Sequence, residues 1–236
     1  MTTTVTVRTT LDENRAQALL DRGGFFTRAG LALRAALALA RNPSDTEQVF
    51  VLARALDHGT LPRIRRKLDR SEEGRLLLRE RPAIDTRNVD FAALRALPEH
   101  TLGGAYARML ERNALDPDLF GRPALPDPEL SYVAQRIRQT HDLWHVLTGL
   151  ATDVPGEVAL QAFTDAQLHQ RFSRLIAIGG VLLYGLRYPR MWRLTRSWYR
   201  IGQRVPFLLA VRWEALWQEP LPDVRARLGL VAAERA

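Results

Sequence analysis

The sequence predicts an all-α protein, a single helical domain with a long proline-rich internal loop. Apolar residues recur at helical spacing through most of the 236 residues, whereas the alternation typical of strands is confined to the stretch TVTV near the start. Four prolines fall within residues 115–130, LDPDLFGRPALPDPEL, and they exclude a regular helix there. We expect residues 1–10 to be a disordered tail and residues 11–236 to form one all-helical domain.

Capping residues mark the ends of two expected helices. Ser44 and Glu47 have the spacing of a capping box just ahead of an apolar-periodic run, which predicts a helix start. Asp127 precedes a proline that suits the first helical turn, and Gly149 suits a helix stop. Together Asp127 and Gly149 bound a predicted helix of roughly 20 residues.

The composition limits the classes of function. There is no cysteine, so disulfides and cysteine nucleophiles are excluded, any metal must bind to His, Asp or Glu, and a reducing compartment is expected. The net charge of +8 suits an acidic partner, although the scattered arginines are equally typical of solvated helix faces. We favour a membrane surface over nucleic acid, because the sequence has no basic-aromatic RNA-binding motif and no zinc-finger spacing.

No segment is expected to target the chain for secretion or to cross a bilayer. The first residues lack a basic region followed by an apolar run, so no secretory signal peptide is predicted. The apolar run from Leu175 to Leu186, LIAIGGVLLYGL, has twelve residues, whereas a spanning helix needs about 20.

Two of the five histidines fall in the stretch QTHDLWHVLTG. On a helix, residues four apart lie on one face, so Val133, Ile137, His141 and His145 should form one stripe. Two of these are apolar, which predicts that the stripe faces the interior and that both histidines are partly buried. Core histidines satisfied by hydrogen bonds are the plain interpretation, but two imidazoles at this spacing can also converge on one metal ion.

Glu157 is the candidate third ligand, with eleven residues between it and His145. Pro155 and Gly156 predict a turn that reverses the chain, after which a second helix carries Glu157 in its first turn. A carboxylate there can point back at the histidines, or it can serve only to complement the helix dipole. Asp142 is either a fourth ligand or a partner that orients a histidine.

The ligand types leave the metal and the chemistry open. Two imidazoles and a carboxylate suit a divalent metal and leave coordination positions free, so zinc as a Lewis acid and iron(II) as a redox metal both fit. The motif differs from the peptidase pattern H-E-x-x-H, because Asp142 stands where that pattern has glutamate. We therefore do not expect a peptidase.

His141, Asp142, His145 and Glu157 together resemble the metal-binding motif of the coenzyme Q biosynthesis protein 4 family, which acts in ubiquinone synthesis. The resemblance covers most of the chain from about residue 70 onward. Its further blocks are RSEEGRLLLRERPAID, LPEHTLGGAYARMLERNALDPD, PDPELSYVAQRIRQTHDLWHVLTGL and RWEALWQEPLPDVRARLGL.

The resemblance implies an all-helical homodimer that is cytoplasmic and peripheral on the inner face of the cell membrane. The four motif residues would hold one divalent metal, zinc or iron, and act in catalysis through it. The implied reaction is an oxidative decarboxylation, in which the ring carboxylate of a polyprenyl-hydroxybenzoate intermediate is replaced by a hydroxyl. The family also acts as an organiser of other quinone-biosynthesis enzymes.

Two further segments fit that role, each with a plainer alternative. The run from Leu175 to Leu186 follows the motif and offers an apolar surface for a prenyl tail, or it is a core helix. The segment YPRMWRLTRSWYR, residues 188–200, is typical of an interfacial membrane contact, or it is a solvated amphipathic helix.

Two other functions remain open. The first is a non-catalytic scaffold that binds prenyl lipid and organises the enzymes of quinone synthesis, with a structural metal. The second is a phosphohydrolase in which the adjacent His141 and Asp142 bind metal with an upstream histidine and a downstream aspartate. That pattern leaves His145 and Glu157 unexplained. Its upstream and downstream candidates are His58, His100, Asp153 and Asp165.

Overall fold

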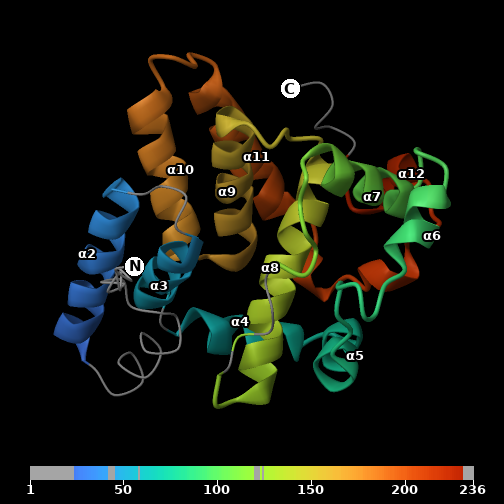
Figure 1. Ribbon diagram of the computed structural model, residues 1–236, viewed down its shortest axis with the longest axis horizontal. Helices are drawn as coiled ribbons and strands as arrows, with labels where there is room; N and C mark the ends of the chain where they lie inside the picture. The colour runs from blue at the N-terminus through green and yellow to red at the C-terminus, as the bar shows by residue number, and fades with distance from the viewer. Residues whose placement is uncertain (1–23, 42–45, 58, 120–122, 124, 231–236) are drawn as a thin grey trace, which may run out of the picture. The chain divides into compact units, whose positions relative to one another are not determined.

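The structure is a computed structural model that describes residues 24–41, 46–57, 59–119, 123 and 125–230 (Figure 1). It divides into two compact units, residues 1–59 and 60–236. In the first unit the described elements are α2 (Phe25–Arg41) and α3 (Thr46–Leu56). The second unit contains α4 (Thr60–Leu68), α5 (Glu72–Glu80), α6 (Phe91–Ala96), α7 (Leu102–Arg112), α8 (Pro128–Thr148), α9 (Val154–Leu168), α10 (Arg171–Tyr184), α11 (Met191–Arg204), the 3₁₀ turns η1 (Leu208–Ala210) and η2 (Trp213–Ala215), and α12 (Leu221–Arg227).

The predicted all-α class is confirmed, because the described residues form helices and no strand. The proline-rich loop is also confirmed: α7 ends at Arg112, α8 begins at Pro128, and the described residues between them are not helical. The expected tail, residues 1–10, and the capping residue Ser44 lie outside the described residues. A single domain over residues 11–236 stays a prediction.

Helix α8 has the ends that its sequence predicts. The Asp127 side chain accepts hydrogen bonds from the backbone N–H groups of Glu129 and Leu130, and Pro128 occupies the first turn. Gly149 ends the helix with φ 72°, a left-handed conformation that favours glycine. The helix between them has 21 residues, and these local signals fix the register of its histidines.

Aromatic contacts join α8, α9 and α11 in the core of the second unit. Trp144 of α8 meets Phe163 of α9 edge-on, with ring centroids 5.7 Å apart. Phe163 in turn meets Trp198 of α11 at 5.9 Å. All three rings are buried. Figure 1 shows α8 running through this unit, with α4, α5 and α7 packed against it and with α10 and α11 packed against α9.

Helix α10 is apolar, but it is not a core helix. Its buried residues are the small Ser173, Ala177 and Gly180, where the helix approaches α9 so closely that a Cβ on Gly180 would lie 2.3 Å from Val158 Cγ2. Its large side chains point away from that contact, and Leu182 is 77% exposed and Leu183 78% exposed. The core-helix interpretation of this run is therefore wrong.

Helix α11 is amphipathic, which both interpretations of its segment allow. It packs against α9 through buried residues that include Met191, Trp198 and Gly202, whereas Trp192 and Arg196 are exposed. No helix among the described residues is both long and apolar enough to cross a membrane.

Candidate metal centre

Helix α8 presents His141 and His145 on one face, as their spacing predicts. Val133 and His145 are buried, and Ile137 and His141 are half-buried, so the predicted inward-facing stripe is confirmed. The two imidazole rings lie edge to face with their centroids 5.2 Å apart. This arrangement leaves both rings able to present a nitrogen to the space between α8 and α9.

Glu157 lies in the first turn of α9, also as predicted. The predicted turn at Pro155 and Gly156 is wrong, however, because α9 begins at Val154 and the chain reverses before it. Asp153 caps the helix by accepting a hydrogen bond from Gly156 N. A proline is tolerated here because the first turn of a helix has no partner for its missing N–H.

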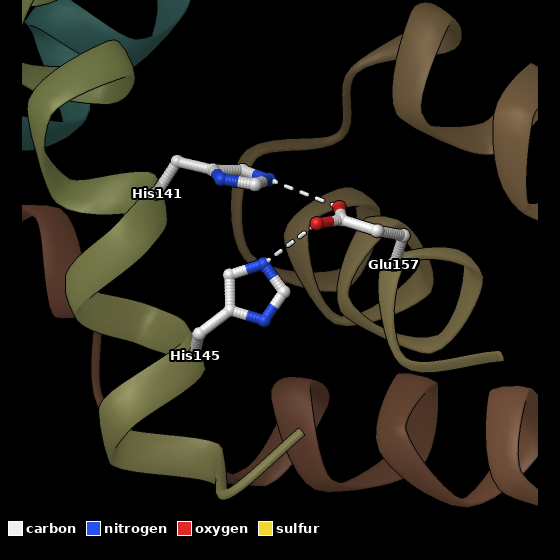
Figure 2. Close-up of side chains that lie close together, drawn as sticks. All are labelled: His141, His145 and Glu157. Carbon is white, nitrogen blue, oxygen red and sulfur yellow. Dashed lines mark ion pairs between the residues drawn. The ribbon is translucent and has the colours of Figure 1, made fainter. Parts of the chain in front are cut away.

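The three side chains converge (Figure 2). Glu157 Oε1 lies 3.1 Å from His145 Nε2, and Glu157 Oε2 lies 3.8 Å from His141 Nε2. One ligand atom from each residue can be chosen so that all lie within 4.8 Å of one another, and in the described part of the chain these three residues form such a group. Figure 2 shows both histidines facing the carboxylate from α8.

The orientation of His145 fits a cation. Its Nδ1 lies 3.0 Å from the carbonyl oxygen of Leu150, so Nδ1 carries the proton and donates it. The other ring nitrogen, Nε2, is then a lone-pair acceptor that is buried, and it makes no hydrogen bond although it faces Glu157. Two acceptors at this separation repel each other unless a proton or a metal ion lies between them. The donor set therefore fits a metal ion.

His141 is oriented by Asp142. The Nδ1 atom of His141 lies 3.3 Å from Asp142 Oδ1, which leaves Nε2 facing Glu157. Asp142 thus lies beside the far nitrogen of the ring, outside the group of three. Gln161, which the sequence analysis did not single out, brings its amide nitrogen to 3.4 Å from His141 Nε2. The i,i+4 rule applied from Glu157 would have found it.

The charges of the site influence one another. Burial opposes ionisation of Glu157, but His145 and His141 outweigh burial, and the pKa of the carboxyl is lowered from its ordinary value. Burial likewise opposes protonation of His141, but Asp142 and Glu157 outweigh it and raise the pKa of the imidazole. Without a metal, these two shifts favour a negatively charged Glu157 beside a positively charged His141.

The residues that the phosphohydrolase interpretation needs have other partners. Asp153 caps α9, and Asp165 pairs with Arg174 at 2.9 Å. His100 is exposed and lies outside the group of three, and His58 falls outside the described residues. None of these arrangements supports that interpretation.

The fold and the site define an all-helical protein with two imidazoles and a carboxylate gathered as a candidate metal centre. The family model for coenzyme Q (ubiquinone) biosynthesis protein Coq4 matches residues 23–234. The chain belongs to this family, and it is a ubiquinone-biosynthesis protein.

Relatives and a solved structure agree with this assignment. The Culex quinquefasciatus protein named ubiquinone biosynthesis protein COQ4 homolog 1, mitochondrial, is 34% identical over 202 residues, which cover 85% of this chain and 74% of that protein. The human COQ4 homolog, also named mitochondrial, is 34% identical over 201 residues, covering 84% and 76%. A crystal structure of a putative ubiquinone biosynthesis protein from Nostoc punctiforme matches with a TM-score of 0.68 and 30% identity, covering 86% of this chain and 98% of that one.

Proposed function

We propose that the protein is a metal-dependent enzyme that replaces the ring carboxylate of a polyprenyl-hydroxybenzoate intermediate by a hydroxyl. The convergence of His141, His145 and Glu157 carries this proposal, and membership of the ubiquinone-biosynthesis family supports the substrate class. The net reaction converts the aromatic carboxylic acid, water and dioxygen into the phenol, carbon dioxide and hydrogen peroxide, so that water supplies the hydroxyl oxygen and dioxygen accepts the two electrons that the substrate loses.

The roles of the residues follow from their geometry. His141 and His145 would bind a divalent metal, zinc or iron, through Nε2, and Glu157 would bind it through its carboxylate. Of the two roles left open for Asp142, its place beside His141 Nδ1 supports that of orienting the ring. When bound, the metal supplies Lewis-acid chemistry and, as iron(II), redox chemistry.

The exposure of the two histidines suggests where the substrate enters. The His145 side chain is 2% exposed, whereas that of His141 is 29% exposed. The site is therefore closed around His145 and open on the side of His141. A substrate carboxylate would approach from that open side.

Reconstitution tests the proposal. The purified protein and a His145→Ala variant are dialysed against a weak chelator, analysed for bound metal, then given iron(II) or zinc, dioxygen and a short-chain prenyl-hydroxybenzoate. We expect near-stoichiometric metal in the wild type alone, together with carbon dioxide release and a hydroxylated product in the mass spectrum. Failure of the wild type to bind either metal would overturn the metal-dependent assignment.

A scaffold that binds prenyl lipid is the second candidate, and the exposed face of α10 favours it. Most of the exposed large apolar side chains among the described residues lie on this helix and in the connection to α11, where Leu186 is fully exposed and Arg187 follows directly. Apolar side chains beside arginine suit the boundary of an anionic membrane, where the prenyl substrate also resides. Metal binding without turnover would support this role over the enzyme.

A further inference from the structure

We propose that Arg225 of α12 is a positioning residue of the metal centre, which acts on His145 through the end of α8. The inference rests on the proposed metal-dependent function and adds a residue that acts through the backbone. Arg225 Nε donates to the carbonyl oxygen of Leu147, and Arg225 Nη2 donates to that of Val146, each at 3.0 Å. Both carbonyls belong to the last turn of α8, where a helix has no N–H to offer them.

The end of α8 places the carbonyl group that orients His145. After Thr148 the chain turns at Gly149, whose φ of 72° is left-handed, and Leu150 comes back to the last turn of the helix. The Leu150 N–H donates to Thr148 Oγ1 at 3.3 Å, and the Leu150 carbonyl oxygen accepts from His145 Nδ1 at 3.0 Å. The imidazole therefore takes its orientation from the backbone just beyond the turn that Arg225 closes.

Two acceptors compete for the single proton of a neutral His145 ring. The Leu150 carbonyl oxygen lies 3.0 Å from Nδ1, and Glu157 Oε1 lies 3.1 Å from Nε2 (Figure 2). Because a carboxylate is the stronger acceptor, the ring would carry its proton on Nε2 if the carbonyl moved away. A proton on Nε2 occupies the lone pair that a metal needs. The position of Leu150 thus decides whether His145 is ready to bind metal.

Arg225 holds this end of the helix through charge as well as hydrogen bonds. A guanidinium at the C-terminal end of a helix meets the negative end of the helix dipole. Val146 is 8% exposed and Leu147 is 1% exposed, so water can replace the guanidinium at their carbonyls only if the last turn opens. Such an opening would carry the Leu150 carbonyl away from His145.

The ring nitrogens of His145 test the proposal in the metal-free protein. The wild type, Arg225→Gln and Arg63→Gln are isotope-labelled at the histidine nitrogens and compared by NMR at about pH 9, where the imidazole is neutral. Arg63→Gln is the matched control, because Arg63 donates to the carbonyl oxygens of Leu168 and His169 at the end of α9 away from the metal centre. We expect the proton on Nδ1 in the wild type and the control, and on Nε2 in most molecules of Arg225→Gln.

Zinc titration of the same full-length proteins against a chelating dye gives a second readout. We expect Arg225→Gln to bind zinc at least about tenfold more weakly than the wild type. Arg63→Gln should bind zinc as the wild type does, although it loses a similar contact at a helix end. Arg225→Lys keeps the charge but has one donor nitrogen in place of the planar fork, so its affinity should lie between those of Arg225→Gln and the wild type.

The outcomes separate this role from the proposed function. A His145 ring that keeps its proton on Nδ1 in Arg225→Gln would overturn the role of Arg225, whatever the zinc affinity, and would leave the three-residue site standing. Equal changes in Arg63→Gln would also overturn it, because loss of stability alone would then explain them. If Arg225→Gln does not fold, Arg225→Lys supplies the same comparison. Absence of zinc binding in the wild type would overturn the metal-dependent function, and the ring spectra alone would then decide whether Arg225 orients His145.

Discussion

Helices α8 and α10 differ in which of their side chains are buried. In α8 the buried residues include the polar Gln139 and Thr140 and the charged Arg136, whose side chain is 1% exposed. In α10 the apolar Leu182 and Leu183 are more than three-quarters exposed. The helix with the more apolar sequence is therefore the one that leaves its large side chains in contact with solvent.

The difference lies in the partners that each helix has. Arg136 donates to the Glu214 carboxylate at 2.7 Å and to the carbonyl oxygens of Leu209 and Val211. Buried charge is tolerated when it is paired in this way. Helix α10 contacts α9 through small residues, and no described residue gives its outer face comparable cover. Burial thus depends on what the rest of the chain supplies, and polarity alone does not decide it.

Removing the partner of Arg136 should give the largest loss of stability. We expect Glu214→Ala to lower the free energy of unfolding by about 3 kcal/mol, because the buried guanidinium keeps only carbonyl partners. The control is Glu111→Ala, which breaks the exposed pair with Arg95 and should cost less than about 1 kcal/mol. Urea unfolding of both variants measures the two losses in the free energy of unfolding. Equal losses would mean that burial does not make the pair between Arg136 and Glu214 more important than an exposed pair.

The two adjacent glycines of α10 should respond with opposite signs. A Cβ on Gly180 meets the stiff side chain of Val158, so Gly180→Ala should destabilise the protein by about 1–3 kcal/mol. A Cβ on Gly179 meets nothing within 4 Å, and Gly179→Ala should stabilise it by about 0.5–1 kcal/mol through helix propensity. Thermal unfolding of both variants tests the pair. Two changes of the same sign would contradict the close contact between α10 and α9.

Asp142→Asn should weaken metal binding by about 10–100-fold, because the ring of His141 loses its orienting carboxylate. The pH dependence should change as well. An imidazolium cannot bind metal, so wild-type affinity falls as pH decreases through the raised pKa of His141. Since Asp142 helps to raise that pKa, the fall should begin at a lower pH in the variant. Zinc titrations from about pH 5 to about pH 8, a range centred on the ordinary pKa of histidine, test both effects. An unchanged pH profile would argue against this role of Asp142.

Changing the exposed face of α10 should leave stability nearly unaltered. The double variant Leu182→Ser, Leu183→Ser should unfold within about 0.5 kcal/mol of the wild type. Its binding to vesicles that contain anionic lipid should fall roughly tenfold or more, since burying a leucine contributes about 1.5–3 kcal/mol. Leu119→Ser, an exposed leucine in the connection between α7 and α8, is the control. Equal vesicle binding by all three proteins would count against a membrane contact here.

The features that the sequence predicted correctly depend on short-range chemistry. Asp127 caps α8 and Gly149 ends it through hydrogen bonds within a few residues, so their types alone indicate the ends of the helix. The shared face of His141 and His145 then follows from helical geometry. Glu157 was placed correctly although the turn before it was not, because Pro155 suits both a turn and a first helical turn.

The features that the sequence left open or missed depend on contacts between distant segments and on side-chain rotamers. The exposure of Leu182 and Leu183 reflects which elements reach α10, and no local pattern contains that information. The position of Asp142 beside His141 Nδ1 is a matter of side-chain rotamer, so the sequence left two roles open. Gln161 was overlooked because its contact with His141 depends on how α9 lies against α8.

The C-terminal end of α8 depends on a residue that follows it far along the chain, with sequence separations of 78 and 79 in the two contacts. Arg225 of α12 donates to the carbonyl oxygens of Val146 and Leu147, which have no partner within their own helix. During synthesis the chain emerges from the ribosome with its N-terminal part first. A nascent chain that has not yet reached α12 therefore holds His145 and Glu157 but lacks the guanidinium that closes the end of α8, so this end of the site is completed only once α12 has been made.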